Sequence, residues 1–276
     1  MTFSLYNSYY GYSEKCWKPD SFLFFDIEFL VWVGREKNMK EDIHSNTGQE
    51  EYVICHEIAD LLRIPDDDRA LMQTDTMDEI LIASIVDTLV TYGKNKEQIH
   101  KIAQISKLLS QKMGLGEVHV EIIEKAALIY DVGNLKIDPD IYKKGNRLSF
   151  EEFEIIKEHT SIGYEVLKAQ KSKILDMGAS LSAEHHEWYD GSGYPYGLAG
   201  EEISIFARIV ALADTAGALS APRYGRQTVD FGEILAHVHK RSDSQFDPMI
   251  VEQFHESKEV IEEILEYGFS SNDERA

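Results

Sequence analysis

The sequence predicts a mainly α-helical protein that carries a smaller N-terminal domain of α or α/β structure. Two observations predict the helical class. From about Met77 onward, apolar residues recur at helical spacing in one segment after another, and these segments begin and end at capping residues, glycines and prolines. A third observation divides the chain, because the run Pro65-Asp66-Asp67-Asp68 is typical of a domain boundary. We therefore expect two domains, residues 1–75 and residues 76–270.

The composition is that of an acidic globular protein. Its 276 residues, 43% of them hydrophobic, suffice for a full core. The formal net charge of −21 disfavours a DNA-binding surface and predicts repulsion from anionic membranes. No membrane-length apolar run and no secretion signal is present, so we expect a cytoplasmic protein. Cys16 and Cys55 are too few for a disulfide scaffold and too far apart for a Cys-x-x-Cys metal pair.

The N-terminal region carries no catalytic constellation. Phe22 to Gly34 is an aromatic and aliphatic run that fits either a strand or a buried helix. Glu50 to Ile64 has apolar residues at helical spacing. The region lacks the acidic cluster and the strand-helix alternation of a phosphoacceptor domain. We expect it to be a sensory, regulatory or dimerisation domain, which leaves a homodimer as one arrangement of the protein.

The helices of the second domain follow in order. Ile80 to Tyr92 is apolar on one face, and Gly114 is expected to stop the helix from Gln98 to Met113. Val120 to Val132 has the same periodicity and is expected to form one helix. The expected core stripe of the second of these helices consists of Ile99, Ile102, Ile105 and Leu109.

The later helices have clearer start signals. Ser149 to Glu152 is a capping box, and the helix that it opens places His159 on the same side as Ile155 and Gly163. Helices are also expected from Ile174 to Ala183 and from Ile205 to Leu219. A final pair of helices follows, and the second of them begins at the N-cap Asp247, with Pro248 in its first turn.

The densest group of polar residues runs from Glu184 to Pro195. It holds two adjacent histidines, His185 and His186, and a Gly-Ser-Gly loop followed by Tyr194. Neighbouring histidines are unusual in a core, whereas neutral imidazoles are common ligands of transition metals. This stretch therefore indicates one wall of a metal site.

Four other polar residues are ambiguous when taken singly. His100 lies beside an apolar stripe, Asp131 ends an apolar helix, and His159 and Asp214 lie on inward faces. Each fits a solvated or hydrogen-bonded structural role as well as a ligand role. Together with the histidine pair they come from different helical segments, as ligands do in the metal centre of a helical bundle. Six such ligands favour two transition-metal ions bridged by a carboxylate, and two ions favour hydrolysis of a phosphate ester.

At this point the sequence resembles a known family. The family motif is present as His185-His186-Glu187-x-x-Asp190-Gly191-x-Gly193-Tyr194-Pro195-x-Gly197-Leu198-x-Gly200-x-x-Ile203, followed by Ala207-Arg208-Ile209 and Ala213-Asp214. Further matches are His100, Ala126-Ala127-Leu128-Ile129-x-Asp131-x-Gly133, Lys157-Glu158-His159-Thr160-x-x-Gly163, Arg223-x-x-Arg226 and Phe246-Asp247-Pro248. This pattern, over roughly residues 77 to 265, is similar to the HD-GYP family of the HD superfamily. Members of that family are helical phosphodiesterases that open cyclic di-GMP.

The resemblance implies a role for each matching residue. It implies a metal-dependent phosphodiesterase acting on cyclic di-GMP or a related cyclic dinucleotide, with a metal-assisted water as the nucleophile. Two divalent ions, iron or manganese, are expected, and a single bound ion is the alternative. Catalysis would depend on Asp131, which bridges the ions, and on His159. The implied metal ligands are His100, Asp131, His159, His185, His186 and Asp214, and the implied substrate-binding residues are Arg223, Arg226, Tyr194 and Arg208.

The sequence also departs from the family pattern. Tyr130 stands where the family has the histidine of its His-Asp pair, and Asn134 stands where it has a lysine. Ala103 replaces an arginine, and Gly217 replaces an acid. A neutral phenol is a poor metal ligand, because its pKa of about 10 leaves it protonated at neutral pH. The alternative function is therefore a catalytically weak or inactive module that binds a nucleotide or protein partners as a signalling adaptor.

Overall fold

The computed structural model describes residues 77–142, 144, 148–168, 172–221 and 228–268. All of them belong to a unit that begins at Asp75. These described ranges contain helices and loops but no strand, apart from one isolated bridge between Ser242 and Phe246. The helical class predicted for this part of the chain is confirmed. The predictions for the N-terminal domain, Phe22 to Gly34 and Glu50 to Ile64 included, lie outside the described residues.

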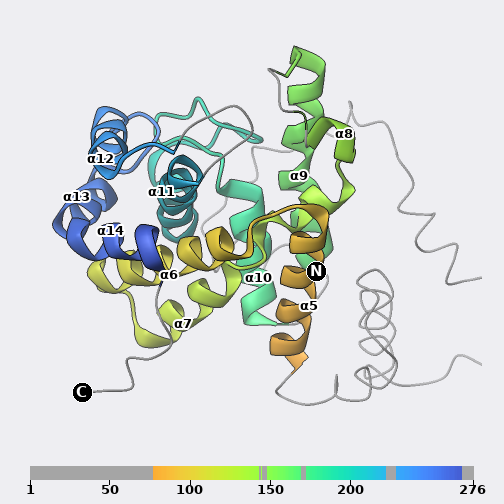
Figure 1. Cartoon of the computed structure of the whole chain (residues 1–276), viewed down its shortest axis with the longest axis horizontal. Coiled ribbons are helices and arrows are strands. Elements are labelled where there is room, and N and C mark those ends of the chain that lie inside the picture. Colours follow the sequence, from red (N-terminus) through yellow and green to blue (C-terminus); the bar gives the residue numbers. More distant parts are fainter. Residues whose placement is uncertain (1–76, 143, 145–147, 169–171, 222–227, 269–276) are drawn as a thin grey trace, which may run out of the picture. The chain divides into compact units, whose positions relative to one another are not determined.

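The helices form a bundle with a central group and two flanking groups (Figure 1). Helices α6, α7, α10 and α11 lie in the middle, with α5, α8 and α9 on one side and α12, α13 and α14 on the other. The elements in chain order are α5 (Met77–Tyr92), α6 (Lys96–Lys112), α7 (Glu117–Ala126), the 3₁₀ helix η3 (Tyr130–Lys136), α8 (Pro139–Tyr142), α9 (Phe150–Lys168), α10 (Lys173–Glu184), the 3₁₀ turn η4 (Gly200–Glu202), α11 (Ile205–Ser220), α12 (Phe231–Lys240), α13 (Pro248–Glu256) and α14 (Lys258–Tyr267).

The predicted start and stop signals are confirmed. Glu152 N–H donates to Ser149 Oγ (3.2 Å), and Ser149 N–H donates back to the Glu152 carboxylate (2.7 Å), which is the reciprocal pattern of a capping box. Asp247 Oδ1 accepts from Met249 N–H at the start of α13 (2.9 Å). Gly114 follows α6 with φ +72°, a conformation that glycine adopts without strain.

The core is built from the apolar stripes of these helices. The predicted stripe of α6, from Ile99 to Leu109, is buried. The expectation for α9 was wrong in part, because Ile155 is 37% exposed. The buried face of α9 instead consists of His159, Thr160, Gly163 and Leu167, so the inward position of His159 is confirmed.

The prediction that Val120 to Val132 forms one helix is wrong. Helix α7 ends at Ala126, and the chain then turns into η3, which carries Tyr130 and Asp131. The helical periodicity of the sequence is overridden by tertiary contacts of η3, because an unbroken helix could not bring these two side chains to their partners on α9 and α11.

Two glycines set the close approach of the elements that carry the site. A Cβ atom on Gly133 of η3 would lie 2.0 Å from the backbone oxygen of His159 on α9. A Cβ atom on Gly163 of α9 would lie 2.0 Å from Ser182 Oγ on α10. Since neither position has room for a side chain, η3 packs directly on α9 and α9 packs directly on α10. This packing brings Asp131, His159 and the end of α10 together.

The last predicted helix is split in two. Helix α13 ends at Glu256 and α14 begins at Lys258, with Ser257 between them. The bend lets α13 contact both α11 and α6 while α14 lies along α6. Phe254 and Ile261 are both fully buried as a result. Burial of two apolar faces on different helices explains the break that the sequence pattern did not predict.

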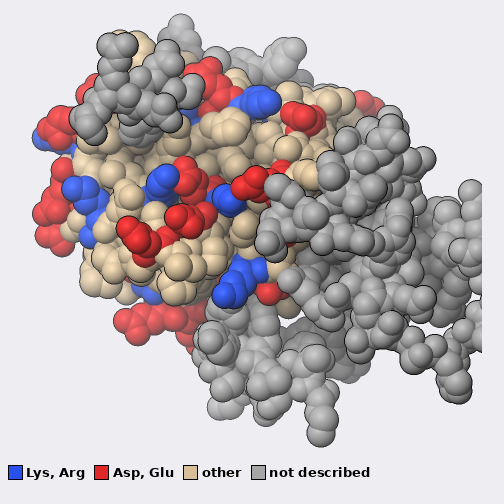
Figure 2. Space-filling view, turned by 90° about the horizontal axis from the view of Figure 1, so that it is seen from below, with Lys and Arg blue, Asp and Glu red and all other residues tan. Residues whose placement is uncertain are grey.

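The described surface is mixed in charge. No helix among the described residues is long and apolar enough to cross a bilayer. Figure 2 shows one face of the molecule, on which Lys and Arg side chains are scattered among Asp and Glu, and no continuous basic patch covers the part of that face that is described.

Candidate metal centre

Four predicted ligands converge where η3, α9 and α10 meet. Asp131 comes from η3, His159 from the buried face of α9, and His185 and His186 from the end of α10. His159 Nε2 lies 3.3 Å from His185 Nε2, and Asp131 Oδ1 lies 3.5 Å and 3.8 Å from the same two nitrogens. Ring nitrogens of His159, His185 and His186 all lie within 4.8 Å of one another. We call these four residues the histidine cluster.

Backbone carbonyls fix the orientation of two of the imidazoles. His159 Nδ1 lies 2.6 Å from Ile156 O, and His185 Nδ1 lies 2.9 Å from Leu181 O and 3.0 Å from Ser182 O. A carbonyl oxygen can only accept, so each Nδ1 must carry the proton and donate it. In the neutral rings both Nε2 atoms are therefore bare acceptors. Hydrogen bonding of this kind is what orients metal-binding histidines.

Burial disfavours the charged form of two of the imidazoles. Burial lowers the pKa of His159 to about 4, even though the carboxylate of Asp131 acts in the opposite direction. Burial also lowers the pKa of His186 well below its ordinary value, and the neighbouring rings of His185 and His159 lower it further. At neutral pH the rings of His159 and His186 are therefore uncharged, and His159, whose Nδ1 donates to a carbonyl, presents the lone pair of Nε2.

The chemistry of the cluster fits a divalent transition-metal ion. Two bare Nε2 atoms and the carboxylate oxygen of Asp131 lie close together, and a cation bound among them would offset the cost of burying three acceptors in contact. Neutral imidazoles with a carboxylate are the ligand set of zinc, iron, manganese or nickel, in contrast to the oxygen-only set of calcium.

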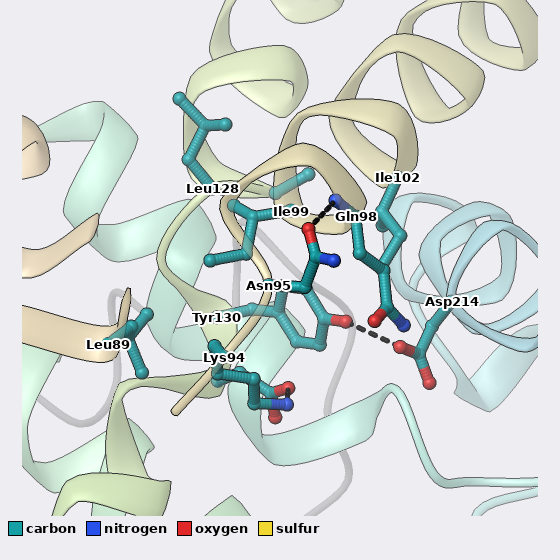
Figure 3. Close-up of a pocket in the computed structure, with 11 residues that line it drawn as sticks. Leu89, Lys94, Asn95, Gln98, Ile99, Ile102, Leu128, Tyr130 and Asp214 are labelled. Atoms are coloured by element: carbon teal, nitrogen blue, oxygen red, sulfur yellow. Dashed lines mark hydrogen bonds and ion pairs between the residues drawn. The ribbon is translucent and has the colours of Figure 1, made fainter. Parts of the chain in front are cut away.

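On the other side of Asp131 the polar groups pair with one another. Tyr130 O–H donates to Asp214 Oδ1 of α11 (2.7 Å), and Figure 3 shows the phenol directed at that carboxylate. The ammonium of Lys94 pairs with Asp131 Oδ2. Burial would raise the pKa of Asp131, but Lys94 and the two nearest imidazoles outweigh burial and hold that pKa below its ordinary value. The residues Lys94, Tyr130 and Asp214, which line one small pocket with Asp131, are called the tyrosine side below.

Comparison with known proteins identifies the family. Residues 79–250 match the HD domain family. The chain belongs to the HD domain family. It is 35% identical over 172 residues to the "Cyclic di-GMP phosphodiesterase response regulator RpfG" of Xanthomonas campestris, an alignment that covers 62% of this chain and 46% of that protein. It is 34% identical over 185 residues to a "Cyclic di-GMP phosphodiesterase" of Thermotoga maritima, covering 66% of this chain and 50% of that protein.

Other HD domain relatives extend the comparison. A "3'3'-cGAMP-specific phosphodiesterase 2" of Vibrio cholerae is 32% identical over 154 residues, covering 56% of this chain and 30% of that protein. The chain thus spans half or less of the length of these curated relatives. Bd1817, described as an HDG"Y"P protein from Bdellovibrio bacteriovorus, has the same fold at 13% identity, with a TM-score of 0.51 over 86% of this chain and 77% of that one. These matches confirm the resemblance to the HD-GYP branch of the family.

Two of the six predicted ligands of this HD domain lie outside the histidine cluster. His100 is exposed on the surface of α6, because its neighbour Ile99 takes the buried position of that turn. Asp214 accepts a hydrogen bond from Tyr130, and among the ion pairs of the described residues it has none with the cluster histidines, whereas Asp131 has two. The structure therefore brings together only Asp131, His159, His185 and His186.

Three of the residues that differ from the family pattern have structural roles in this chain. Asn134 is buried, and its side-chain amide donates to the backbone oxygen of Asp131 (3.1 Å). A Cβ atom on Gly217 would lie 2.7 Å from Ile102, so the close packing of α11 on α6 leaves no room for an acid there. Ala103 is 2% exposed and belongs to the core. These positions are structural in this HD domain.

The loop after the histidines is organised by Glu187, whose role the sequence did not reveal. Its carboxylate accepts from the backbone N–H groups of Tyr196 (2.6 Å), Gly197 (3.2 Å) and Leu198 (3.0 Å). Glu187 is 2% exposed, and burial raises its pKa while these three donors act to lower it. The only feature of the sequence that could have indicated this role is the position of the glutamate directly after a histidine pair. Glu187 fixes the loop against the wall of the cluster.

Tyr194, an implied substrate-binding residue, lies beside the histidine cluster. Its ring stacks on His186, with ring centroids 4.7 Å apart, and meets the ring of Phe153 edge-on at 6.1 Å. The Lys157 ammonium lies 5.4 Å from the Tyr194 centroid and 4.9 Å from that of Phe153. Phe153 and Lys157 were not predicted as site residues, because only the folded loop places Tyr194 beside them.

The predicted substrate-binding arginines fall into two groups. Arg208 pairs through Nη1 with the buried carboxylate of Asp247, and its Nε donates to Ile203 O (3.0 Å). The Arg208 side chain, 10% exposed, links α11 to the N-cap of α13, so its contacts are those of a structural residue and not the predicted ones. Arg223 and Arg226 lie outside the described residues.

Proposed function

We propose that this chain is a metal-dependent phosphodiesterase that hydrolyses cyclic di-GMP or a related cyclic dinucleotide. The observation that carries the proposal is the convergence of bare imidazole nitrogens and one carboxylate oxygen in the histidine cluster. Relatives that bear the names of cyclic di-GMP and cGAMP phosphodiesterases support the substrate class. The predicted N-terminal domain, its regulatory or dimerisation role and the cytoplasmic location stay predictions.

The proposed metal ligands are Asp131, His159, His185 and His186. Iron or manganese is the proposed ion, because both accept mixed imidazole and carboxylate ligation. A divalent ion, when bound, supplies Lewis-acid stabilisation of a phosphoryl group and lowers the pKa of water to near neutrality. The protein contributes the rest: carbonyls hold the Nδ1 protons of His159 and His185, and burial keeps both rings in place.

The rim above the cluster suits a dinucleotide. Tyr194 and Phe153 offer aromatic faces on which a base can stack, and Lys157 offers a positive charge beside them. For a chain with a net charge of −21, local cations must hold an anionic substrate. We propose Arg223 and Arg226 as further phosphate ligands, because the guanidinium fork matches phosphate geometry.

A second function is favoured by the tyrosine side. The hydrogen bond between Tyr130 and Asp214, together with the Lys94–Asp131 ion pair, engages the groups that would hold a second ion. A centre with one ion has weaker means of stabilising both the attacking and the leaving oxygen. This observation supports a module that binds a cyclic dinucleotide or a protein partner with little turnover.

The test is a turnover assay on the purified full chain. Protein loaded with Mn²⁺ or Fe²⁺ is incubated with cyclic di-GMP or with 3'3'-cGAMP, and products are separated by chromatography, in parallel with His159→Ala and the surface control His239→Ala. Hydrolysis that is retained in His239→Ala and lost in His159→Ala supports the phosphodiesterase. Nucleotide binding by calorimetry without turnover supports the adaptor. A protein that neither binds nor hydrolyses a cyclic dinucleotide contradicts the phosphodiesterase and the nucleotide-binding adaptor.

A further inference from the structure

Lys94 lies in a short, closed connection between α5 and α6. Lys94 N–H donates to Leu89 O (2.9 Å), and Gly93 N–H donates to the same oxygen (3.1 Å). The next residue, Asn95, caps α6 by accepting from Gln98 N–H (3.1 Å). These bonds hold the backbone of the connection in one conformation, with Lys94 beside the pocket shown in Figure 3. The position of the Lys94 backbone is thus set by helix ends on both sides.

The two carboxylate oxygens of Asp131 face different partners. Oδ2 pairs with Lys94, whereas Oδ1 faces His159 Nε2 and His185 Nε2 at 3.5 Å and 3.8 Å. A carboxylate that bridges two ions would offer one oxygen to each. In this chain the oxygen directed away from the histidine cluster already has a cation, and that cation is a side chain.

Tyr130 and Asp214 complete the same side. Tyr130 is 3% exposed, its ring meets His185 edge-on with centroids 4.7 Å apart, and its hydroxyl donates to Asp214 Oδ1. A second ion here would therefore meet a neutral phenol in place of an imidazole. It would also lie next to the Lys94 ammonium, and the two positive charges would repel each other in a partly buried site.

We propose that the Lys94 ammonium is a built-in cation that replaces a second metal ion on Asp131, so that the centre holds one divalent ion. The proposal rests on the metal site of the proposed function and specifies its composition. Lys94 is a positioning residue in this account: it neutralises Asp131 and holds Oδ1 toward the histidines. It follows that restoring an imidazole at position 130 is insufficient to restore a second ion while Lys94 is present.

The test measures the number of bound ions. Full-length protein is stripped of metal, titrated with Mn²⁺ by calorimetry, and analysed for manganese per chain after gel filtration. We expect one Mn²⁺ in the wild type and one in Tyr130→His. We expect two in the double variant Lys94→Met/Tyr130→His, with the second ion bound at least ten-fold more tightly than any second event in the wild type. Lys96→Met/Tyr130→His is the matched control, because Lys96 lies two residues away and pairs with Asp87 on the surface, and it should bind one.

Each outcome bears on the proposal. Two ions in the wild type or in Tyr130→His overturn the replacement by Lys94 and leave the phosphodiesterase standing. One ion in a folded double variant also overturns it. No ion in the wild type overturns the metal site, and with it everything that rests on that site. The wild-type and Tyr130→His measurements decide the question even where the double variant does not fold, which circular dichroism reports.

Discussion

The two sides of Asp131 are built on different principles. On the histidine cluster, neutral rings and a carboxylate oxygen meet as acceptors, and their protons are directed outward to backbone carbonyls. On the tyrosine side, every named polar group already has a partner within the protein: Lys94 with Asp131, and Tyr130 with Asp214. The first arrangement needs an added cation, whereas the second supplies its own.

This difference suggests a way for a two-metal site to keep one ion position without the other. With tyrosine at position 130, the carboxylates of Asp131 and Asp214 lie beside an ammonium and a phenol hydroxyl. A buried carboxylate without a cation is costly. In this chain the Lys94 ammonium pairs with Asp131 and the Tyr130 hydroxyl donates to Asp214, which is the arrangement that the one-ion proposal rests on.

The largest expected effect comes from removing a ligand of the histidine cluster. His159→Ala should lower metal affinity by more than the roughly 10–100-fold that loss of an outer-shell partner costs, because it removes a bare nitrogen from the site itself. Calorimetric titration with Mn²⁺ measures the change, and His239→Ala on exposed α12 serves as the control. Unchanged affinity in His159→Ala would show that the cluster does not hold the metal.

Next in size is a change that affects both sides at once. Gly133→Ala places a methyl group 2.0 Å from His159 O, so η3 must move away from α9 with both Tyr130 and Asp131. We expect a loss of about 1–3 kcal/mol in the free energy of unfolding, the usual range for overpacking, and weaker Mn²⁺ binding. Urea denaturation measures the first quantity.

The matched glycine control is Gly116→Ala. Its added methyl would meet only His119 Nδ1, at 3.8 Å, which is an ordinary contact. This variant should lose less stability than Gly133→Ala and should bind Mn²⁺ like the wild type. Equal losses in the two variants would contradict the role assigned to the close approach of η3 and α9.

A loss of stability of the same order, but confined to one loop, is expected where that loop borders the histidine cluster. Glu187→Gln replaces one of the two carboxylate oxygens by an NH₂ group. One carbonyl oxygen then remains for three backbone N–H donors, and at least one of these donors faces the NH₂ group. Loss of a buried acceptor costs about 1–3 kcal/mol. Hydrogen exchange at Tyr196, Gly197 and Leu198 should become faster, while exposed Glu201→Gln should leave it unchanged. Unaltered exchange in Glu187→Gln would mean that other contacts fix the loop.

The smallest effect should be confined to the tyrosine side. Tyr130→Phe removes the hydroxyl that donates to Asp214 and keeps the ring against His185. A hydrogen bond of this kind contributes about 0.5–1.5 kcal/mol, and Mn²⁺ affinity should stay within about two-fold of the wild type. Thermal unfolding with Tyr267→Phe as the exposed control measures the stability. A large loss of metal affinity would show that the two sides are coupled and not independent.

Much of the site was readable from residue types and spacing. The capping signals at Ser149 and Asp247 predicted helix starts, and the periodicity of α6 predicted its buried stripe. Imidazoles and a carboxylate placed at helix ends and inward faces predicted a metal centre, and four of the six predicted ligands do converge. These features are local, because capping and helical periodicity depend on residues within a few positions of one another.

What the tertiary structure decided depends on contacts between distant segments. His100 has the residue type of a ligand, but the rotation of α6 leaves it exposed. Lys94 reaches Asp131 across 37 residues, and Tyr130 reaches Asp214 across 84, so no local pattern announces either pair. The sequence by itself determined which chemical groups this protein has and which helical faces carry them. Only the packing of η3 on α9, and of α9 on α10, decided which groups lie together in the histidine cluster and which pair with each other on the tyrosine side, because that packing depends on the steric fit of whole elements.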